Sequence, residues 1–248
     1  INIEKAYKKN SSIVFTWWDY GNWINLISNL TTVIDASGSQ RSPKSYFIAK
    51  SLLSRNQETS YNIINYTLNN KLKMISNHSS DFSKLKKEIN SSLPHKQNTF
   101  VLLTDEMLAW WPSISSIGNW DIINNLPGRK QSFESIKCTF KTKIFLSCGN
   151  FIINIEDGKL NNGLQIKNLA ILENGKVISE KSFKTKQNGP SLIILKDKDK
   201  DKIRFITLEK GMYETTFVKL FLLYDFNKKY FEIFDDGWPH YRVYKLVN

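Results

Sequence analysis

The segment Thr16-Trp17-Trp18-Asp19-Tyr20-Gly21 carries the residues best suited to bind a ligand. Each indole offers a flat apolar surface and one N–H donor, whereas a carboxylate only accepts hydrogen bonds. Together they would accept a hydrogen bond from a hydroxyl group beside an apolar wall. The glycine allows a sharp turn after the tyrosine because it tolerates positive φ. The same residues also suit a structural role, with Trp17 and Trp18 in the core and Asp19 capping a helix.

A second apolar set follows the predicted strand Thr99–Leu103. Met107, Trp110 and Ile114 stand at positions i, i+3 and i+7, so a helix here would carry them on one face. Pro112 would kink or end this helix unless it lies in the first turn. Taken alone, the stripe is typical of a helix that packs on a core.

The remaining polar residues do not form a recognisable catalytic motif. The three histidines have no partners at metal or triad spacing, and there is no Gly-rich phosphate loop and no Cys/His or Ser/His set. Cys138 and Cys148 suit either a cross-strand disulfide in a hairpin or two free thiols. The sequence therefore predicts recognition of a ligand, and not bond making, in this chain.

The chain has 248 residues and 41% hydrophobic content, enough to bury a sizeable core. No apolar run approaches the roughly 20 residues that a bilayer span needs, and no signal peptide is visible. Because the chain starts at Ile1 without Met, we expect it to be a piece of a longer protein.

The formal net charge is +12, which favours an anionic partner such as nucleic acid, lipid head groups or a phosphorylated ligand. A solvated Lys-rich surface explains the charge equally simply. The densest run, Lys196 to Lys202, alternates in sign, which is typical of a solvated loop or edge.

Periodicity predicts an α+β protein with a mainly helical central core that contains the Trp-Trp-Asp-Tyr-Gly segment. A short strand should end near Trp18, a helix should follow Ser42-Pro43, and helices are expected over Thr59–Ser76 and Gly211–Leu223. Residues 132–202 have a period nearer two with Asn-Gly and Asp-Gly turns, so we expect a small antiparallel β insertion. The predicted domains are a core of 1–131 with 203–248, and an insertion of 132–202.

Trp17-Trp18-Asp19-Tyr20-Gly21 resembles the signature of the catalytic subunit of oligosaccharyltransferases, the membrane enzymes of protein N-glycosylation. Trp23-Ile24 and the segment Thr32 to Gly38 are also similar to that family. Ile203 to Asn248 resembles the short bacterial members. The resemblance spans the chain and is strongest over Ile13 to Gly38. It implies a C-terminal soluble globular domain whose transmembrane half lies upstream.

The resemblance also implies an activity for the full-length protein. Such glycosyltransferases move a lipid-pyrophosphate-linked oligosaccharide (on dolichyl or undecaprenyl carriers) to Asn in an Asn-x-Ser/Thr sequon. In the family, acidic residues of the membrane half hold a divalent metal, Mg or Mn, and activate the amide. This fragment alone is therefore expected to be inactive, with no catalytic residue and no bound metal.

The expected partners are the acceptor polypeptide, the lipid-linked oligosaccharide and the chain's own N-terminal transmembrane domain. The charge is also compatible with an anionic membrane surface, and no nucleic-acid partner is expected. The implied location is the inner membrane, with this domain on the periplasmic side.

By resemblance, Trp17, Trp18 and Asp19 would receive the hydroxyl of the sequon Ser or Thr, supported by Tyr20 and Gly21. Bacterial members carry a Met-x-x-Ile-x-x-x-(Ile/Val/Trp) segment beside this pocket. The positions that match it, Met107, Trp110 and Ile114, would form an apolar wall for the Thr methyl. Trp110 replaces the middle Ile, and the sequence does not decide whether it keeps that contact or crowds the pocket.

Two other functions fit parts of the sequence. A basic nucleic-acid-binding module agrees with the charge and the 13% aromatic content, although the acid beside the Trp pair argues against it. A carbohydrate-binding domain would use Trp17, Trp18 and Trp110 as stacking platforms.

Overall fold

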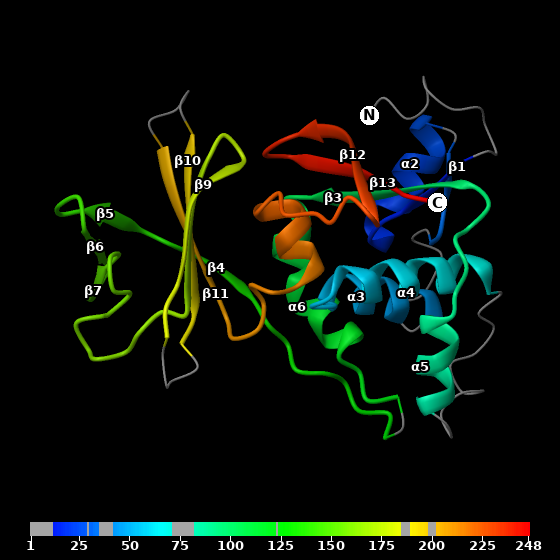
Figure 1. Ribbon diagram of the computed structural model, residues 1–248, viewed down its shortest axis with the longest axis horizontal. Helices are drawn as coiled ribbons and strands as arrows, with labels where there is room; N and C mark the ends of the chain where they lie inside the picture. Colours follow the sequence, from blue (N-terminus) through cyan, green and yellow to red (C-terminus); the bar gives the residue numbers. More distant parts are fainter. Residues whose placement is uncertain are drawn as a thin grey trace. The chain divides into compact units, whose positions relative to one another are not determined.

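The computed structural model describes residues 12–28, 30–34, 42–70, 82–122, 124–184, 189–197 and 202–248 (Figure 1). The chain divides into two units. The first takes in residues up to Gln131 together with Thr215–Phe221 and Asp225–Asn248, and the second comprises Ser132–Glu214 with Leu222–Tyr224. Helices and sheets both occur, and the strands of the sheets are mostly antiparallel, so the predicted α+β class is confirmed.

The first unit is built on a five-stranded mixed sheet of order β12-β13-β3-β1-β2. Strand β1 runs parallel to both β2 and β3, whereas β13 runs antiparallel to β3 and to β12. The central strand β3 is buried along almost its whole length, as its compact apolar run predicts. The strands are β1 (Ser12–Phe15), β2 (Thr31–Thr32), β3 (Asn98–Thr104), β12 (Phe231–Gly237) and β13 (Tyr241–Leu246).

Two helices of this unit begin at a capping side chain. Ser42 accepts a hydrogen bond from the Lys44 backbone at the start of α3, with Pro43 in the first turn. The Asn56 side chain caps α4 in the same way. In Figure 1, α3 and α4 lie along one side of the sheet. The helices are η1 (Trp18–Tyr20), α2 (Gly21–Ser28), α3 (Pro43–Leu53), α4 (Gln57–Asn69), α5 (Phe82–Asn90) and α6 (Glu106–Gly118).

Helix α6 continues through Pro112, which lies in its interior, so the proline does not end the helix. The helix packs closely on α3 at Gly118, where a Cβ atom would stand only 2.8 Å from the carbonyl carbon of Ala49. A larger side chain at this position would push the two helices apart. The crossing thus fixes the position of α6 in the first unit.

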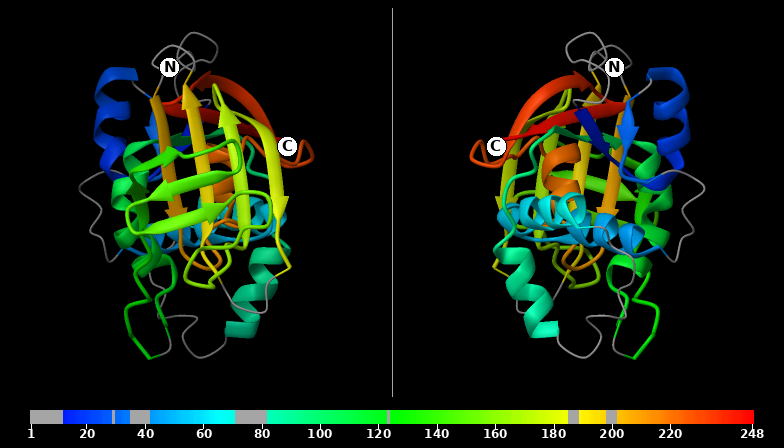
Figure 2. Two further views of the ribbon diagram at one scale, coloured as in Figure 1. Left: turned by 90° about the vertical axis from the view of Figure 1, so that its left-hand side faces the viewer. Right: turned by 90° about the vertical axis from the view of Figure 1, so that its right-hand side faces the viewer.

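The second unit contains a five-stranded sheet of order β4-β11-β10-β8-β9 and a three-stranded sheet of order β5-β6-β7. Strands β8, β10 and β11 lie side by side (Figure 2). Its buried core includes Leu146, Leu192 and Phe205. The strands are β4 (Phe133–Ile136), β5 (Cys138–Phe140), β6 (Phe145–Cys148), β7 (Phe151–Asn154), β8 (Asn168–Glu173), β9 (Lys176–Ser182), β10 (Ser191–Asp197) and β11 (Lys202–Leu208).

Cys138 and Cys148 face each other across β5 and β6 and form a disulfide. This settles the choice that the sequence left open between a bridge and free thiols. The insertion is not purely antiparallel, because β8 and β10 run parallel.

Three expectations differ from the structure. Strand β11 pairs with β10 and β4, so this segment lies in the second unit and the predicted boundary at 202 moves to Glu214. The expected helix over 211–223 shortens to the π-helix η3 (Val218–Leu222), because Thr216 turns its backbone N–H and its hydroxyl to the Ser54 carbonyl instead. The core also holds more strand than predicted, since five strands accompany its helices.

Parts of two segments singled out in the sequence lie outside the described residues. These are positions 71–76 of the expected helix Thr59–Ser76 and positions 35–38 of the segment Thr32 to Gly38. Within the described ranges, every helix is too short or too polar to cross a bilayer.

Candidate functional site

The Trp-Trp-Asp segment lies at the carboxyl end of β1. Because β1 and β3 run parallel, with Phe15 opposite Val101, their carboxyl ends meet at the same edge of the sheet. The chain leaves β1 into η1 and leaves β3 into α6, so the two predicted site segments come together there. The Thr16 hydroxyl donates a hydrogen bond of 3.0 Å to the Leu102 carbonyl and fastens the first segment to β3.

The two adjacent tryptophans have different environments. Trp17 is fully buried in the core of the first unit, whereas Trp18 is partly exposed. Their ring centroids are 6.3 Å apart, and Trp18 lies at the same distance from Trp110 on its other side. Trp110 is 41% exposed, so Trp18 and Trp110 together form an aromatic surface that solvent reaches.

Asp19 follows this surface and is partly exposed. Among the described residues, its Oδ2 atom has no hydrogen-bond partner although it is buried, and the same holds for the indole nitrogens of Trp17 and Trp18. Buried polar atoms usually have partners, and a ligand is one explanation when they do not. A hydroxyl group that donated to the Asp19 carboxylate would supply one of the missing bonds.

The pKa of Asp19 is raised from its ordinary value, mainly because burial disfavours the charged carboxylate. The neighbouring Trp17 indole N–H lowers this pKa, although it makes no hydrogen bond of ordinary geometry with the carboxylate. The negative charge of Glu106 raises it further. An added hydrogen-bond donor would therefore stabilise the charged form of Asp19.

Tyr20 joins the two segments directly. Its hydroxyl donates a hydrogen bond of 2.8 Å to Glu106 Oε2 and accepts one of 2.7 Å from Thr104 Oγ1. Burial raises the pKa of Tyr20, the Thr104 hydroxyl lowers it, and the Glu106 carboxylate raises it again. Tyr20 therefore stays protonated and acts as a donor to Glu106. Gly21 begins α2 directly after this contact.

The predicted apolar wall is only partly present at the surface. Met107 and Ile114 are fully buried, and the third member of their helix face is Trp111, also buried, whose ring lies 4.9 Å from that of Phe217. Trp110 points away from this stripe, so it is the member of the predicted set that solvent reaches. The buried face of α6 carries Met107, Trp111 and Ile114 at positions i, i+4 and i+7. The sequence prediction placed Trp110 on this face, at i+3, and is corrected here.

Sequence reasoning did not identify Thr104 and Glu106 as parts of the site. No motif marks them, and only the parallel pairing of β1 with β3 brings them to Tyr20. Next to them, Asp105 Oδ2 lies 3.3 Å from His240 Nδ1, and the Asp105 backbone N–H donates to the His240 carbonyl. The β12–β13 turn is thus fastened to the same end of β3.

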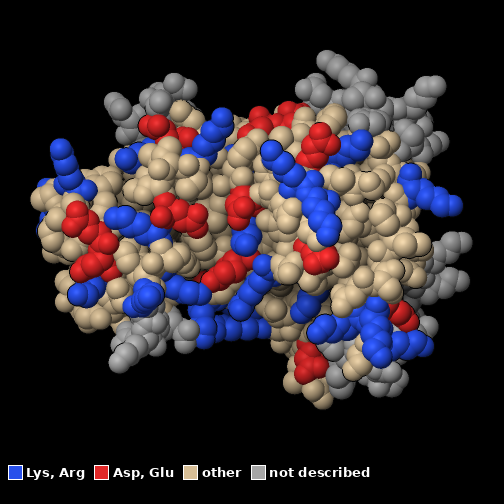
Figure 3. Space-filling view, in the orientation of Figure 1, with Lys and Arg blue, Asp and Glu red and all other residues tan. Residues whose placement is uncertain are grey.

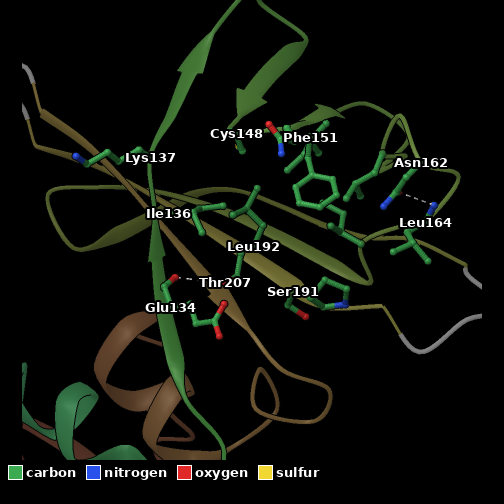
Figure 4. Close-up of a pocket in the computed structure, with 16 residues that line it drawn as sticks. Glu134, Ile136, Lys137, Cys148, Phe151, Asn162, Leu164, Ser191, Leu192 and Thr207 are labelled. Atoms are coloured by element: carbon green, nitrogen blue, oxygen red, sulfur yellow. Dashed lines mark hydrogen bonds between the residues drawn. The ribbon is translucent and has the colours of Figure 1, made fainter.

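Described side chains of His, Cys, Asp and Glu do not gather in threes that could hold a metal ion. The divalent metal implied by the resemblance therefore has no fitting site in these residues, and no chemical step follows through one here. The second unit contains a separate cavity of about 570 Å³ with mainly apolar walls, including Ile136, Phe151 and Leu192 (Figure 4). It includes none of the predicted site residues.

Residues 10–124 match the family model described as the STT3/PglB/AglB core domain. This segment, just under half of the chain, is similar to that core domain. The match covers β1, the Trp-Trp-Asp segment, β3 and α6, which are the elements that build the candidate site. The likeness to this family model therefore includes the candidate site.

A solved structure shares the fold of the STT3/PglB/AglB core domain and of the insertion. The crystal structure of the C. jejuni PglB C-terminal domain aligns with a TM-score of 0.71 over 99% of this chain and 97% of that chain. The sequences are 16% identical, so the likeness concerns the fold. The comparison with curated proteins gave no match.

Proposed function

We propose that this chain is the acceptor-recognition domain of a membrane oligosaccharyltransferase, which transfers a lipid-pyrophosphate-linked oligosaccharide to Asn in Asn-x-Ser/Thr. One observation carries the proposal. Trp18 and Asp19 present polar atoms without partners beside the exposed ring of Trp110, within the segment that matches the STT3/PglB/AglB core domain. The ligand is the hydroxyl group of the sequon Ser or Thr.

This contact favours a peptide that carries a hydroxyl group at the sequon position. A Ser or Thr hydroxyl donates to the Asp19 carboxylate and accepts from an indole N–H, so it satisfies atoms that otherwise have no partner. A peptide with Ala at this position leaves the carboxylate partly desolvated and unpaired. The loss of one hydrogen bond to a charged group costs about 1.5–3 kcal/mol.

The Thr methyl group packs on the face of Trp110 in this proposal. Met107 and Ile114 are buried and do not contact the peptide in this proposal. Their side chains hold α6 in place, so that Trp110 lies at the surface. One buried methyl is worth about 0.8 kcal/mol. The aromatic ring thus provides the apolar contact that the middle Ile provides in the bacterial motif.

The remaining parts of the reaction belong to the membrane half of the enzyme. That half would hold the divalent metal (Mg or Mn), the lipid-linked donor and the groups that activate the acceptor amide. This domain would then lie on the periplasmic side of the inner membrane, and the chain alone would bind peptide without transferring glycan.

Both rival functions lose support. Trp17 is buried, so it cannot serve as one of the three stacking platforms of a carbohydrate-binding domain. On the face shown in Figure 3, Lys and Arg side chains are interspersed with Asp and Glu side chains. Asp19 follows Trp18 in η1 and Glu106 lies in α6 with Trp110, and both carboxylates would repel a nucleic acid.

The test is Asp19→Ala in the intact gene product, with transfer to a fluorescent Asn-x-Thr peptide as the readout. We expect kcat/KM to fall by at least tenfold, equivalent to about 1.4 kcal/mol. The matched control is Asp235→Ala, which removes an aspartate on β12 in the same unit. Transfer within twofold of wild type for Asp19→Ala would refute the proposal.

A further inference from the structure

We propose that Tyr20 and Glu106 are positioning residues that hold Trp18 and Asp19 against Trp110, and that their hydrogen bond thereby sets the affinity for the acceptor peptide. The proposal rests on the proposed function and concerns residues that do not touch the sequon. It explains how a surface assembled from two distant segments keeps a single geometry.

The hydrogen bond and the ring contact connect the same two elements. Tyr20 and Trp18 both belong to η1, and Glu106 and Trp110 both belong to α6. Residues at i and i+4 of a helix lie on one side, one turn apart. The Tyr20–Glu106 bond of 2.8 Å therefore lies directly beside the Trp18–Trp110 contact at 6.3 Å and limits its movement.

The two elements differ in how firmly they are anchored. Helix α6 is fixed by three fully buried side chains, Met107, Trp111 and Ile114. By contrast, η1 is a three-residue 3-10 helix that has no buried residue and no side-chain cap at Trp17. The Tyr20 hydroxyl attaches η1 to Thr104 and Glu106 at the end of the sheet. We therefore expect η1 to shift when the Tyr20 hydroxyl is lost.

The Thr104 hydroxyl makes the position of the Tyr20 ring more definite. It donates to the Tyr20 oxygen at 2.7 Å, so this oxygen both accepts and donates, and its direction is set by two partners. Thr104 is the last residue of β3, the central strand of the buried sheet. The phenol is thus held between the end of a rigid strand and the first residue of a rigid helix.

The experiment measures KM and kcat of the intact gene product for an Asn-x-Thr peptide. We expect Tyr20→Phe and Glu106→Ala each to raise KM about tenfold, or 1.4 kcal/mol, with kcat at saturation within twofold of wild type. The double variant should be no worse than either single one, because both remove the same bond. Glu106→Gln keeps an acceptor oxygen for the Tyr20 hydroxyl and should restore most of the affinity.

The matched control is Tyr241→Phe. Its hydroxyl also donates to a carboxylate, Asp235 Oδ2 at 3.4 Å, within the β12–β13 hairpin. It should leave KM unchanged. Unchanged KM in Tyr20→Phe and Glu106→Ala, additive effects in the double variant, or a fall in kcat alone would overturn the proposal.

A second readout does not need transferase activity. Near-UV circular dichroism of the 248-residue chain reports coupling between neighbouring indoles, and Trp110→Phe gives the spectrum without the Trp18–Trp110 contact. Tyr20→Phe should shift the wild-type spectrum toward that reference, whereas Tyr241→Phe should not. A wild-type spectrum for Tyr20→Phe would refute the positioning role. If Asp19→Ala retains full transfer, the proposed function fails, and the spectrum still decides the positioning role.

Discussion

The rings of Trp18 and Trp110 are tilted by 56° with 6.3 Å between their centroids, although they come from segments that follow two different strands. The contact exists because β1 and β3 are parallel neighbours whose carboxyl ends open at one edge of the sheet. Asp19 lies beside this aromatic pair with one buried oxygen lacking a partner among the described residues. The candidate site is thus a product of sheet topology as well as of a short motif.

The first prediction concerns the different roles of the tryptophans. Trp17→Ala should lower the free energy of unfolding by about 3–5 kcal/mol, because it leaves a large cavity in the core. Trp23→Ala should change it by less than about 0.5 kcal/mol, since Trp23 is 66% exposed on α2. Urea denaturation followed by circular dichroism measures both. Equal effects of the two substitutions would mean that Trp17 is not a core residue.

The second prediction concerns the pH dependence of stability. The pKa of Asp19 in the folded state is raised above 3.8, so the folded state binds a proton more readily than the unfolded state. Asp19 therefore reduces stability at neutral pH, and this cost disappears as the pH falls below 3.8. Asp19→Asn should be at least as stable as wild type at pH 7 and lose that advantage on acidification.

Thermal unfolding of both proteins between pH 3 and pH 7 measures this effect. Asp236→Asn, which changes another aspartate of the first unit, serves as a comparison: it removes the ion pair with Arg242 and should lower stability at pH 7. A stability advantage of wild type over Asp19→Asn that grows with pH would contradict the raised pKa.

The third prediction concerns Arg242, a charged side chain that is 1% exposed. Its Nη1 donates to the Phe221 carbonyl at 2.6 Å, its Nε lies 3.1 Å from Asp236 Oδ1, and its guanidinium lies 4.6 Å from the Trp238 ring centroid. Removing a large, fully buried side chain leaves a cavity and typically costs about 2–5 kcal/mol. Arg242→Ala should lower the unfolding free energy by this amount. Urea denaturation would contradict the account if the loss were below 1 kcal/mol.

The sequence predicts local structure here better than it predicts contacts between distant segments. Ser42-Pro43 starts α3 as expected, because an N-cap and a first-turn proline act within a few residues. The Asp-Gly and Asn-Gly turns likewise indicate the strands of the insertion. Strand β11 was assigned to the wrong unit, since its partners β10 and β4 are a matter of pairing and not of periodicity.

In the candidate site too, the sequence predicts individual residues better than contacts between distant segments. The residues Trp18 and Asp19 were evident from their types, and the resemblance named Trp110. No sequence motif predicts the parallel strand pairing that brings Thr104 and Glu106 to Tyr20 at the site. A one-position ambiguity also misplaced the helix face: spacings of three and four both fit a helix, and the structure buries Trp111, not Trp110, with Met107.

The most direct test of the central claim is a double-mutant cycle between Asp19 and the peptide hydroxyl. Transfer by the wild-type and Asp19→Ala gene products would be measured with Asn-x-Thr and Asn-x-Val peptides, which have the same shape. The wild type should prefer Thr by at least tenfold more than Asp19→Ala does, about 1.4 kcal/mol of coupling. If both proteins prefer Thr over Val by the same ratio, Asp19 does not receive the hydroxyl and the account is wrong.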